Sequence, residues 1–572
     1  MRAVASISIH RPQRWDEPFS DAMSDADVDW LLTKPPLSRI DPSKFPSATS
    51  LREILRNDTR IVRSQPGDII VREGDYGHSA FLILQGRVRV ILGQLDEEIL
   101  GRQQTRKKTF LQVLRQAWAN PRLPEVRDAA RYGKASGTDQ RGQGSEVRVF
   151  LQDAPAIFAR QETVLLEEGT FFGEIAALGR TPRTATVIAD GECALLEIRW
   201  QGLRDIRRWA DEVKAYIDQL YRERSLKVHL KATPVFTHLS EEDLGAIAEH
   251  TSFESYGSFD WHGTYTQLEK LDPSERVLHE PIIANEGDYP GGLIMIRAGF
   301  TRLTERVDRG DQTVSYLGRG AAFGFSEIAH NWRFEGQVPL QQTLRAIGYV
   351  DVLRVPTFII EKYVLPTIPE NLLPPPIKVR TTARSAWKEA GRPGLDAGLL
   401  EFFVDNRVVN GTATMLIDLD RCTRCDDCVR ACAAAHGNNP RFIRHGKRHG
   451  RYLVANACMH CVDPVCMIGC PTGAIHRDSY KGQVVINDST CIGCSTCANS
   501  CPYDNIRMVQ IRDRSGAVIQ DQNTCLPILK ATKCDLCGDQ LGGPACQRAC
   551  PHDALIRMDM ADHQALLRWV DR

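Results

Sequence analysis

The chain has 572 residues, close to four times the length of a typical domain, so we expect several domains instead of one hydrophobic core. The 72 Lys and Arg residues balance the 72 Asp and Glu residues, which excludes the basic excess of a protein that binds nucleic acid in bulk. No apolar run is long enough to span a membrane, and the N-terminus lacks the apolar core of a secretory signal. The sequence therefore predicts a cytoplasmic protein with no membrane span and no nucleic-acid partner.

The first part of the chain has the pattern of short strands separated by glycines. Residues 64–92 alternate apolar runs with Gly, which is typical of strands in a β-barrel or jelly roll. A second copy occurs at 279–303, and the tetrapeptide EGDY at 73–76 recurs at 286–289. The constant offset between the copies indicates a tandem repeat.

The segment FFGEIAALGRTPRTATV at 171–187 carries the most specific motif of this part. Gly173 can open a short helix whose free N–H groups face a phosphate, and Glu174 can accept hydrogen bonds from a ribose 2′-hydroxyl. Nine residues later, Arg183 can bind a cyclic phosphate with its planar guanidinium group. A lone Gly-Glu pair or a lone arginine would be unspecific, but the complete motif behind a run of strands separated by glycines is specific.

This motif resembles the phosphate-binding cassette of cyclic-nucleotide-binding domains, as in catabolite activator proteins and protein-kinase regulatory subunits. The resemblance implies cAMP or cGMP as the ligand. The implied binding residues are Gly173, Glu174, Ile175, Ala176, Arg183, Thr184 and Ala185. The alternative left open is a folded relic that no longer binds nucleotide and serves as an interaction module.

Two further segments accompany the first copy. Residues 94–160 form a long insertion, for which we expect a mobile surface loop with one helix near 108–119 in preference to a docking arm. Residues 204–228 have helical periodicity. On this helix Tyr216 or Tyr221 could stack on a nucleotide base, although simple packing is the expected role of both.

The second copy departs from the cassette pattern in the run 321–348. This run keeps the Glu-Ile-Ala of the motif at 327–329, but Ser326 takes the place of the glycine. No arginine follows at the proper distance. The residues available near that position are Gln341, Gln342, Arg333 and Arg345. Because an uncompensated phosphate in a partly buried pocket is costly, we expect no cyclic nucleotide at this second site.

Seventeen of the eighteen cysteines lie in the last third of the chain. Such crowding in a large chain without a signal peptide indicates metal ligation instead of a disulfide framework. Four groups have the spacing of bacterial ferredoxin loops, in which three cysteines hold one [4Fe–4S] cluster and a fourth, near a proline, reaches a partner cluster. The groups are Cys422, Cys425, Cys428, Cys432; Cys458, Cys461, Cys466, Cys470; Cys491, Cys494, Cys497, Cys501; and Cys534, Cys537, Cys546, Cys550. We therefore predict four [4Fe–4S] clusters, with tetrahedral zinc as the disfavoured alternative.

The segments 457–475, 491–506 and 533–537 resemble the four-cluster iron–sulfur subunit of the dimethyl-sulfoxide-reductase and formate-dehydrogenase class. The resemblance covers about residues 412–560 and implies that the groups pair first with fourth and second with third. In that pairing the last cysteine of each group joins the first three cysteines of its partner group.

Two cysteines lie outside the four groups, and the first group lacks the proline that usually follows it. Cys193 and Cys525 belong to no group, and we expect both to be packed thiols. Ala433 follows the first group where a proline is usual, which removes no ligand.

These patterns predict a multidomain fold. It comprises two mainly-β, jelly-roll, cyclic-nucleotide-binding-like domains with flanking helices, and an α+β ferredoxin-like domain with four [4Fe–4S] clusters. The expected bounds are 1–229 for the first domain with its insertion at about 94–160, 230–370 for the degenerate second domain, 371–411 for a linker and 412–572 for the ferredoxin-like domain.

The sequence shows no helix-turn-helix signature, no dinucleotide-binding glycine fingerprint and no catalytic constellation. The favoured hypothesis is a non-catalytic electron-transfer subunit that relays single electrons to or from a molybdopterin enzyme, a tungsten enzyme or a hydrogenase, with regulation by a cyclic nucleotide at the first barrel. The alternative is an iron–sulfur redox-sensing regulator whose barrels bind a nucleotide or a protein partner. A third hypothesis makes the barrels purely structural elements that mediate oligomerisation.

Overall fold

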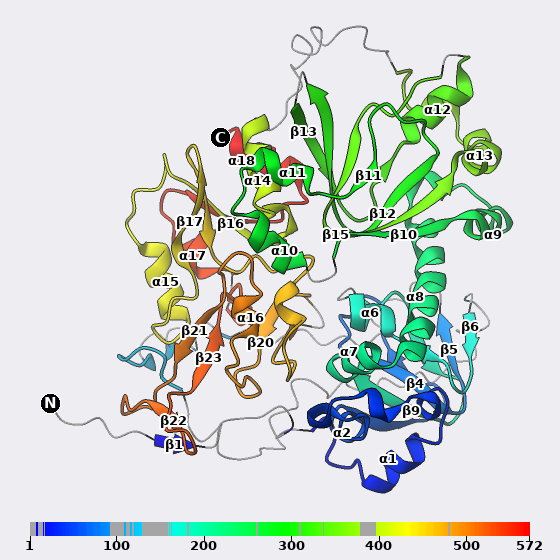
Figure 1. Cartoon of the computed structure of the whole chain (residues 1–572). Coiled ribbons are helices and arrows are strands. Elements are labelled where there is room, and N and C mark those ends of the chain that lie inside the picture. Colours follow the sequence, from blue (N-terminus) through cyan, green and yellow to red (C-terminus); the bar gives the residue numbers. More distant parts are fainter. Residues whose placement is uncertain are drawn as a thin grey trace.

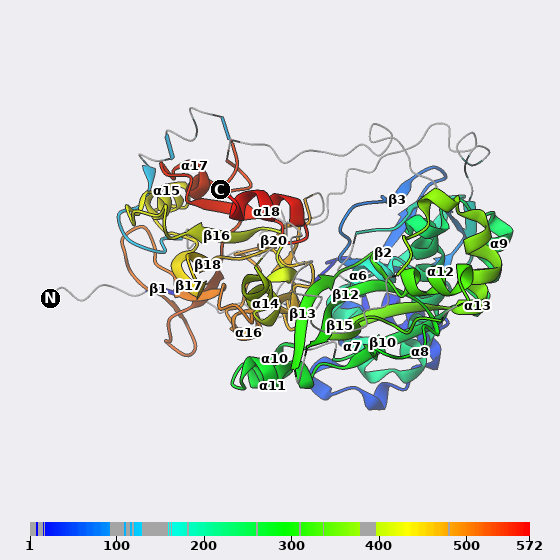
Figure 2. The ribbon, with the colours of Figure 1, turned by 90° about the horizontal axis from the view of Figure 1, so that it is seen from above.

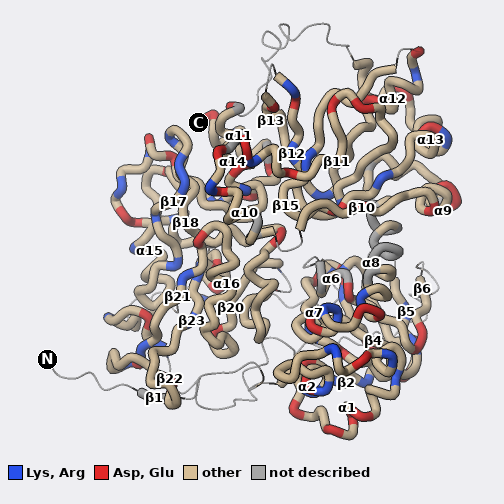
Figure 3. The backbone as a smooth tube through the Cα atoms, in the orientation of Figure 1, with Lys and Arg blue, Asp and Glu red and all other residues tan. Residues whose placement is uncertain are grey.

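The computed structural model of the chain describes residues 7–9, 15, 18–91, 108–109, 112, 115–116, 119–127, 158, 161, 163–179, 182–258, 261–307, 310–335, 337–377, 396–478, 481–540 and 542–572. Among these residues no helix is both long and apolar enough to cross a membrane. Figure 3 shows acidic and basic positions in every part of the chain, in keeping with its balanced charge.

Two four-stranded antiparallel sheets form what we call the first barrel, within residues 18–199 (Figure 1, lower right). The sheet orders are β2-β9-β4-β7 and β3-β8-β5-β6. Apolar side chains fill the space between them, and the rings of Phe81 and Phe172 stack with centroids 5.0 Å apart. The expected β-rich fold of this part is confirmed. The strands are β2 (Thr59–Ser64), β3 (Ile69–Val71), β4 (Ser79–Gln85), β5 (Val88–Ile91), β6 (Thr163–Leu166), β7 (Phe171–Phe172), β8 (Thr186–Ala189) and β9 (Cys193–Arg199).

Helices flank the first barrel and lead away from it. The helix expected at 204–228 is two helices, α7 (Trp200–Trp209) and α8 (Asp211–Ala232), and α8 runs toward the second set of sheets (Figure 1). Tyr216 packs into the apolar core, as expected, whereas the side chain of Tyr221 lies outside the described residues. The other helices of this part are α1 (Asp25–Leu31), α2 (Leu51–Asn57) and α6 (Glu174–Gly179).

The second copy of the repeat lies in a six-stranded antiparallel sheet, which we call the second barrel, residues 252–356. Two long strands, β12 (Gly292–Val307) and β15 (Thr343–Pro356), pair along most of their length. The other strands are β10 (Ser252–Tyr256), β11 (Ile282–Ala284), β13 (Gly310–Leu317) and β14 (Ala322–Phe323). The helices are α9 (Glu241–His250), α10 (Trp261–Leu268), α11 (Pro273–Leu278), α12 (Phe325–Arg333) and α13 (Thr357–Ile359).

Residues 396–572 form the ferredoxin-like region, in which short strands frame the cysteine loops. Its largest sheet has the order β17-β18-β16-β24, and two further two-stranded antiparallel sheets pair β19 with β20 and β21 with β23. The strands are β16 (Thr414–Asp418), β17 (Ile443–His449), β18 (Tyr452–Asn456), β19 (Ile475–Arg477), β20 (Val484–Ile486), β21 (Arg507–Gln510), β22 (Ile519–Asp521), β23 (Leu529–Thr532) and β24 (Leu555–Met558). The helices are α14 (Ala397–Asp405), α15 (Asp427–Ala435), α16 (Thr496–Asn499), α17 (Ala545–Arg548) and α18 (His563–Val570).

Within the insertion of the first barrel, the described residues between 108 and 127 lie against the ferredoxin-like region. Gln116 donates a hydrogen bond of 2.8 Å to the Ala435 carbonyl, and Asn120 donates one of 2.7 Å to the Ala434 carbonyl. Figure 2 shows this segment, in cyan, beside α15 and α17. For these residues the expectation of a mobile surface loop is wrong, because their polar groups are paired with a distant part of the chain. Of the rest of the insertion only Phe158 is described, and its ring packs against the first barrel, 4.9 Å from the guanidinium carbon of Arg89.

Two other segments cross the boundaries that we expected. Strand β1 (Ile7–Ile9), assigned to the first domain, pairs in parallel with β22 of the ferredoxin-like region. The expected linker at 371–411 contains α14, whose Leu399 and Phe403 are buried against the second barrel and the ferredoxin-like region. Sequence-local patterns do not report such long-range contacts.

Arg302 joins the second barrel to α14. Its side chain is 1% exposed, and it donates hydrogen bonds to Glu280 at 3.0 Å, to Glu401 at 2.6 Å and to Asp405 at 2.8 Å. Burial raises the pKa of Glu280, although Arg302 opposes that shift. Three carboxylates therefore depend on one guanidinium group for their compensation.

Replacing Arg302 with Ala should destabilise this junction strongly, since it leaves buried carboxylates without their cation. We expect a loss of about 3–5 kcal/mol, measured as a lower urea midpoint by circular dichroism. The matched control is Arg306→Ala on the same strand, which removes an exposed arginine and should change stability by less than about 0.5 kcal/mol. Equal midpoints for the two variants would contradict the role given to Arg302.

Candidate functional site

Two cavities of the ferredoxin-like region are each lined by four cysteines. In both, three cysteines come from one loop and the fourth comes from a different group. The first cavity is lined by Cys422, Cys425, Cys428 and Cys550. The second is lined by Cys470, Cys491, Cys494 and Cys497. Each cavity therefore offers four cysteine sulfurs, and Asp426 and His552 also line the first cavity.

Electrostatics place the other eight cysteines in two further sets. Burial raises the pKa of the Cys461 thiol, and the neighbouring thiolates of Cys458 and Cys501 raise it further. The Cys466 thiol has the same neighbours. These four cysteines form one set.

The remaining set gathers around Cys546. Burial raises the pKa of its thiol to about 12, which Arg557 opposes and the thiolates of Cys534, Cys432 and Cys537 reinforce. In all four sets the sulfurs lie so close together that ionisation of one disfavours ionisation of its neighbours, and bound cationic iron would relieve that repulsion. Sulfur-only sets of four fit a [4Fe–4S] cluster by donor chemistry, and ligation by these sixteen residues stays a prediction.

The cysteine loops share one backbone feature that the sequence did not reveal. In each group the residue before the second cysteine has a positive φ, namely Arg424 at 61°, His460 at 51°, Gly493 at 68° and Leu536 at 56°. Only one of the four is glycine, and a left-handed conformation costs other residues about 1–2 kcal/mol. This strain is kept where the chain must turn sharply enough for consecutive cysteines to face one centre.

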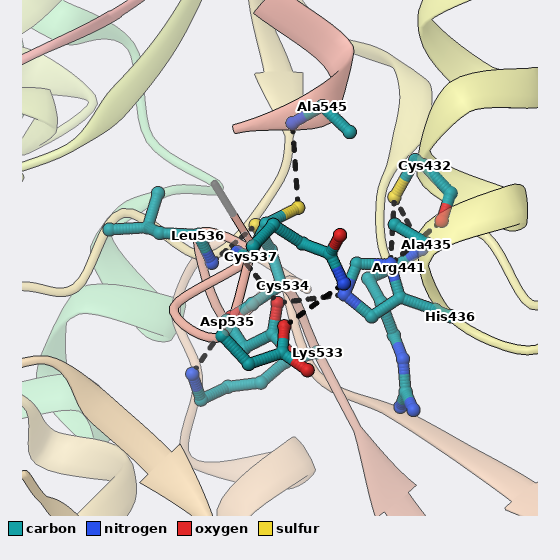
Figure 4. Close-up of polar contacts among 12 residues, drawn as sticks. Cys432, Ala435, His436, Arg441, Lys533, Cys534, Asp535, Leu536, Cys537 and Ala545 are labelled. Carbon is teal, nitrogen blue, oxygen red and sulfur yellow. Dashed lines mark hydrogen bonds and ion pairs between the residues drawn. The ribbon is translucent and has the colours of Figure 1, made fainter. Parts of the chain in front are cut away.

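Polar groups surround the loop of the fourth cysteine group, which begins at Cys534 (Figure 4). His436 Nδ1 lies 3.7 Å from Cys432 Sγ, and Nε2 lies 2.9 Å from Asp535 Oδ1. Burial alone would lower the pKa of His436, but the hydrogen bonds to Asp535 and Cys432 raise it well above its usual range. His436, Asp535 and Cys537 also present ligand atoms within 4.8 Å of one another. Because Cys537 belongs to the fourth group, we assign the His436–Asp535 pair to the surroundings of that thiol set. Sequence reasoning missed both residues.

Arg557 lies between two cysteine sets. Its Nη2 donates to Cys534 Sγ at 2.6 Å, and its Nη1 donates to the Cys458 carbonyl at 3.3 Å. Burial alone would lower the pKa of Arg557, but the thiolates of Cys534 and Cys546 raise it. The residue stands seven positions beyond the last cysteine of the fourth group, in a run with no recognisable spacing. Only the fold reveals it.

The structure brings Gly173, Glu174 and Arg183 together in the first barrel. Gly173 has φ 77° between β7 and α6, and Glu174 is fully buried. Arg183 is 8% exposed, and its Nη1 donates to the Gly173 carbonyl at 2.7 Å, while its Nη2 donates to the Ser79 carbonyl at 2.7 Å. The arginine is therefore held beside the turn at which the cassette helix begins.

The other cassette residues follow the same two segments. Ala176 is buried on α6, Thr184 and Ala185 are half-buried before β8, and the side chain of Ile175 lies outside the described residues. Nucleotide binding by the cassette stays a prediction.

The second barrel corrects our register of its cassette. Gly324, with φ 89°, stands between β14 and α12, so this glycine and not Ser326 occupies the position of Gly173. The place of the arginine is taken by Leu340, not by Gln341 or Gln342. Leu340 exchanges backbone hydrogen bonds with Gly287 and Asp288, as Arg183 does with Gly74 and Asp75.

Leu340 is buried in an apolar cluster, which provides no charge for a phosphate. The two nearby arginines point elsewhere. Arg345 pairs with Asp311 at 2.8 Å, and Arg333 donates to the Ala329 carbonyl at 3.1 Å. These contacts support the expectation that this site holds no cyclic nucleotide.

The two cysteines outside the groups differ from each other. Cys193 is a packed thiol, as expected, and burial raises its pKa to about 11. Cys525 is exposed, so the expectation of packing is wrong for it. It stands in a turn after β22, has φ 58°, and donates its backbone N–H to the Asp521 carbonyl at 2.8 Å.

Comparisons with known proteins match two separate stretches of the chain. The family profile described as a 4Fe-4S dicluster domain matches residues 450–560, and the profile of the cyclic nucleotide-binding domain matches residues 147–208. The electron transport protein HydN of Escherichia coli is 36% identical over 159 residues, which cover 25% of this chain and 87% of HydN.

Two further similarities extend these findings. The arsenate respiratory reductase iron-sulfur subunit ArrB of Shewanella is 29% identical over 197 residues, or 26% of this chain and 83% of ArrB. Among solved structures, the regulatory domain of Toxoplasma gondii PKA with cAMP is 13% identical with a TM-score of 0.19, over 60% of this chain and 93% of that chain. The sequence matches confirm both resemblances, to iron–sulfur electron-transport proteins and to cyclic-nucleotide-binding domains.

Arg557 provides a test of the electrostatics of the thiol sets. Arg557→Gln removes a positive charge beside Cys534, and a nearby cation stabilises the reduced, more negative state of a cluster. We therefore expect the reduction potential of the cluster predicted there to fall, with no loss of iron, in an anaerobic titration followed by electron paramagnetic resonance. Arg557→Lys keeps the charge and should stay closer to the unmodified protein. Unchanged potentials in Arg557→Gln would show that this charge has no such effect.

Proposed function

Because the chain belongs to the family of iron–sulfur electron-transport proteins with a 4Fe-4S dicluster domain, we propose that it is the electron-transfer subunit of an oxidoreductase complex. The observation that carries the proposal is the gathering of sixteen cysteines into four sets of four. A bound [4Fe–4S] cluster supplies reversible one-electron chemistry. The protein would hold four such clusters and provide no catalytic constellation of its own.

The four sets differ in access to solvent, which suggests where electrons enter and leave. Cys425 in the first cavity and Cys494 in the second cavity are exposed. In the other two sets, by contrast, buried cysteines are common: Cys458, Cys466, Cys534, Cys537 and Cys546. A partner can approach a redox centre closely only where the protein covering is thin. We therefore assign the sets of Cys425 and Cys494 to exchange with partners, and the other two sets to transfer within the chain.

The partner that we propose is a catalytic subunit of the molybdopterin, tungsten or hydrogenase class. The similarity to an iron–sulfur subunit of a respiratory reductase supports a role as one subunit among several. The first barrel adds a regulatory function, in which Arg183 would bind the phosphate of a cyclic nucleotide. Because buried Leu340 stands where Arg183 stands in the first barrel, we assign the second barrel a structural role and not a second nucleotide site.

The joining of cysteines across groups can be tested by double substitution. Cys470→Ala and Cys497→Ala belong to one set, so the double variant should lose no more iron than either single variant, about four of roughly sixteen atoms. Cys466→Ala combined with Cys470→Ala removes ligands from two sets and should lose about eight. Cys525→Ala is the control and should keep the full content. Iron analysis after anaerobic purification measures all of these. Additive losses within one set would contradict the assignment.

The nucleotide site can be tested in the full chain. Arg183→Ala should weaken cAMP binding at least about tenfold, because a charge-assisted hydrogen bond contributes about 1.5–3 kcal/mol. Arg87→Ala, which removes an exposed arginine of the same barrel, should leave the affinity unchanged. Equilibrium dialysis with labelled cAMP measures the affinity of both variants. Equal affinities of Arg183→Ala and Arg87→Ala would contradict the role of Arg183 in binding.

A further inference from the structure

The first barrel meets the ferredoxin-like region through Tyr76 and His78. His78 Nε2 lies 2.6 Å from the carbonyl oxygen of Arg477, and since a carbonyl can only accept, this nitrogen carries the proton and donates. Burial lowers the pKa of His78 to about 3, so the imidazole is neutral at physiological pH. The guanidinium carbon of Arg477 lies 5.1 Å from the centroid of the Tyr76 ring. The two parts thus share a polar contact and a cation–π contact.

Arg477 also holds the loop of the second cysteine group. It is 4% exposed, and its Nη2 donates to the carbonyls of Cys461 at 2.7 Å and Val462 at 2.6 Å, while its Nη1 donates to the Gly482 carbonyl at 2.6 Å. Its positive charge lowers the pKa of the Cys461 thiol against the effect of burial. A displacement of Arg477 would therefore change both the geometry and the charge felt by this cysteine set.

On the first-barrel side of this contact, the segment 74–79 is hydrogen-bonded to Arg183 of the cassette. Arg183 N–H donates to the Asp75 carbonyl at 2.8 Å, and the Gly74 N–H donates to the Arg183 carbonyl at 2.8 Å. The Nη2 of Arg183 also donates to the Ser79 carbonyl at 2.7 Å. Tyr76 and His78 lie between these anchored positions. A ligand that attracts the guanidinium of Arg183 must compete with the Ser79 carbonyl, and so acts on the segment 74–79.

We propose that this segment couples nucleotide occupancy at Arg183 to the reduction potential of the centre held by the Cys461 set. The inference rests on the proposed function, since it needs both a bound nucleotide and a redox centre. Reduction adds one electron, and thus one negative charge, to that centre without forming or breaking a bond. Nucleotide binding that draws the segment 74–79 toward the cassette would move Tyr76 away from Arg477 and weaken the hold of this cation on the Cys461 loop, so the two events oppose each other. By linkage, reduction must weaken nucleotide binding by the same factor by which the nucleotide disfavours reduction.

The test compares the cAMP affinity of the full chain, oxidised and reduced with dithionite, by anaerobic equilibrium dialysis. We expect affinity at least about fivefold weaker for the reduced chain, the lower end of typical coupling. For a one-electron centre, a tenfold ratio of affinities corresponds to 59 mV in midpoint potential. A fivefold ratio of affinities therefore corresponds to a midpoint potential about 40 mV lower when cAMP is saturating. Equal affinities in the two states would overturn the coupling and leave binding intact. Absence of binding in both states would overturn the nucleotide function itself.

Variants of Tyr76 test the route. Tyr76→Leu removes the ring beneath Arg477 and should bring the ratio of affinities close to one, with the affinity of the oxidised chain retained. Tyr76→Phe keeps the ring and should keep the ratio. The matched control is Trp30→Leu, which removes another aromatic ring of the first barrel, one that contacts Lys34. A ratio that survives Tyr76→Leu would overturn this route, whereas its loss in Trp30→Leu would point to an unspecific effect of the barrel and overturn it equally.

Discussion

Crowding of cysteine sulfurs, whose ionisation would concentrate negative charge, is the constraint on which the ferredoxin-like region depends. Sixteen thiols lie in one region of the chain, and buried cations stand among them. Lys530 donates to the Cys491 carbonyl at 2.6 Å, Lys533 donates to the Cys534 carbonyl at 2.9 Å, and Arg557 donates directly to a sulfur. Burying these cations is costly unless the carbonyl oxygens that they contact, together with ionised sulfurs, compensate their charge. The cysteine loops and their cations therefore fold as one unit, in which each compensates the other.

Buried arginines also join the three parts of the chain. Arg477 stabilises a cysteine loop and at the same time contacts the first barrel, and Arg302 plays the corresponding part between the second barrel and α14. The insertion of the first barrel and strand β1 add backbone contacts to the ferredoxin-like region. The predicted nucleotide site and the predicted ligands of a redox centre are thus separated by a few packed side chains, where a flexible linker would have kept them independent.

The sequence predicted those features that local chemistry determines. Short cysteine loops must have a narrow spacing, so all four groups were visible, and the cassette motif located Arg183 beside Gly173. The second cassette was misplaced because the segment between Gly324 and Leu340 is longer than that between Gly173 and Arg183, and the register is set by pairing with Gly287 and Asp288. Arg557, His436 and the docked insertion were missed, since each depends on contacts between residues far apart in the chain.

The most direct test of this account is a reductive titration of the anaerobically purified chain, with electrons counted from the dithionite consumed. Four sets of four cysteines predict uptake of about four electrons per chain, one for each [4Fe–4S] cluster. Uptake of about two electrons or fewer from protein with its full iron content would contradict the assignment of four one-electron centres.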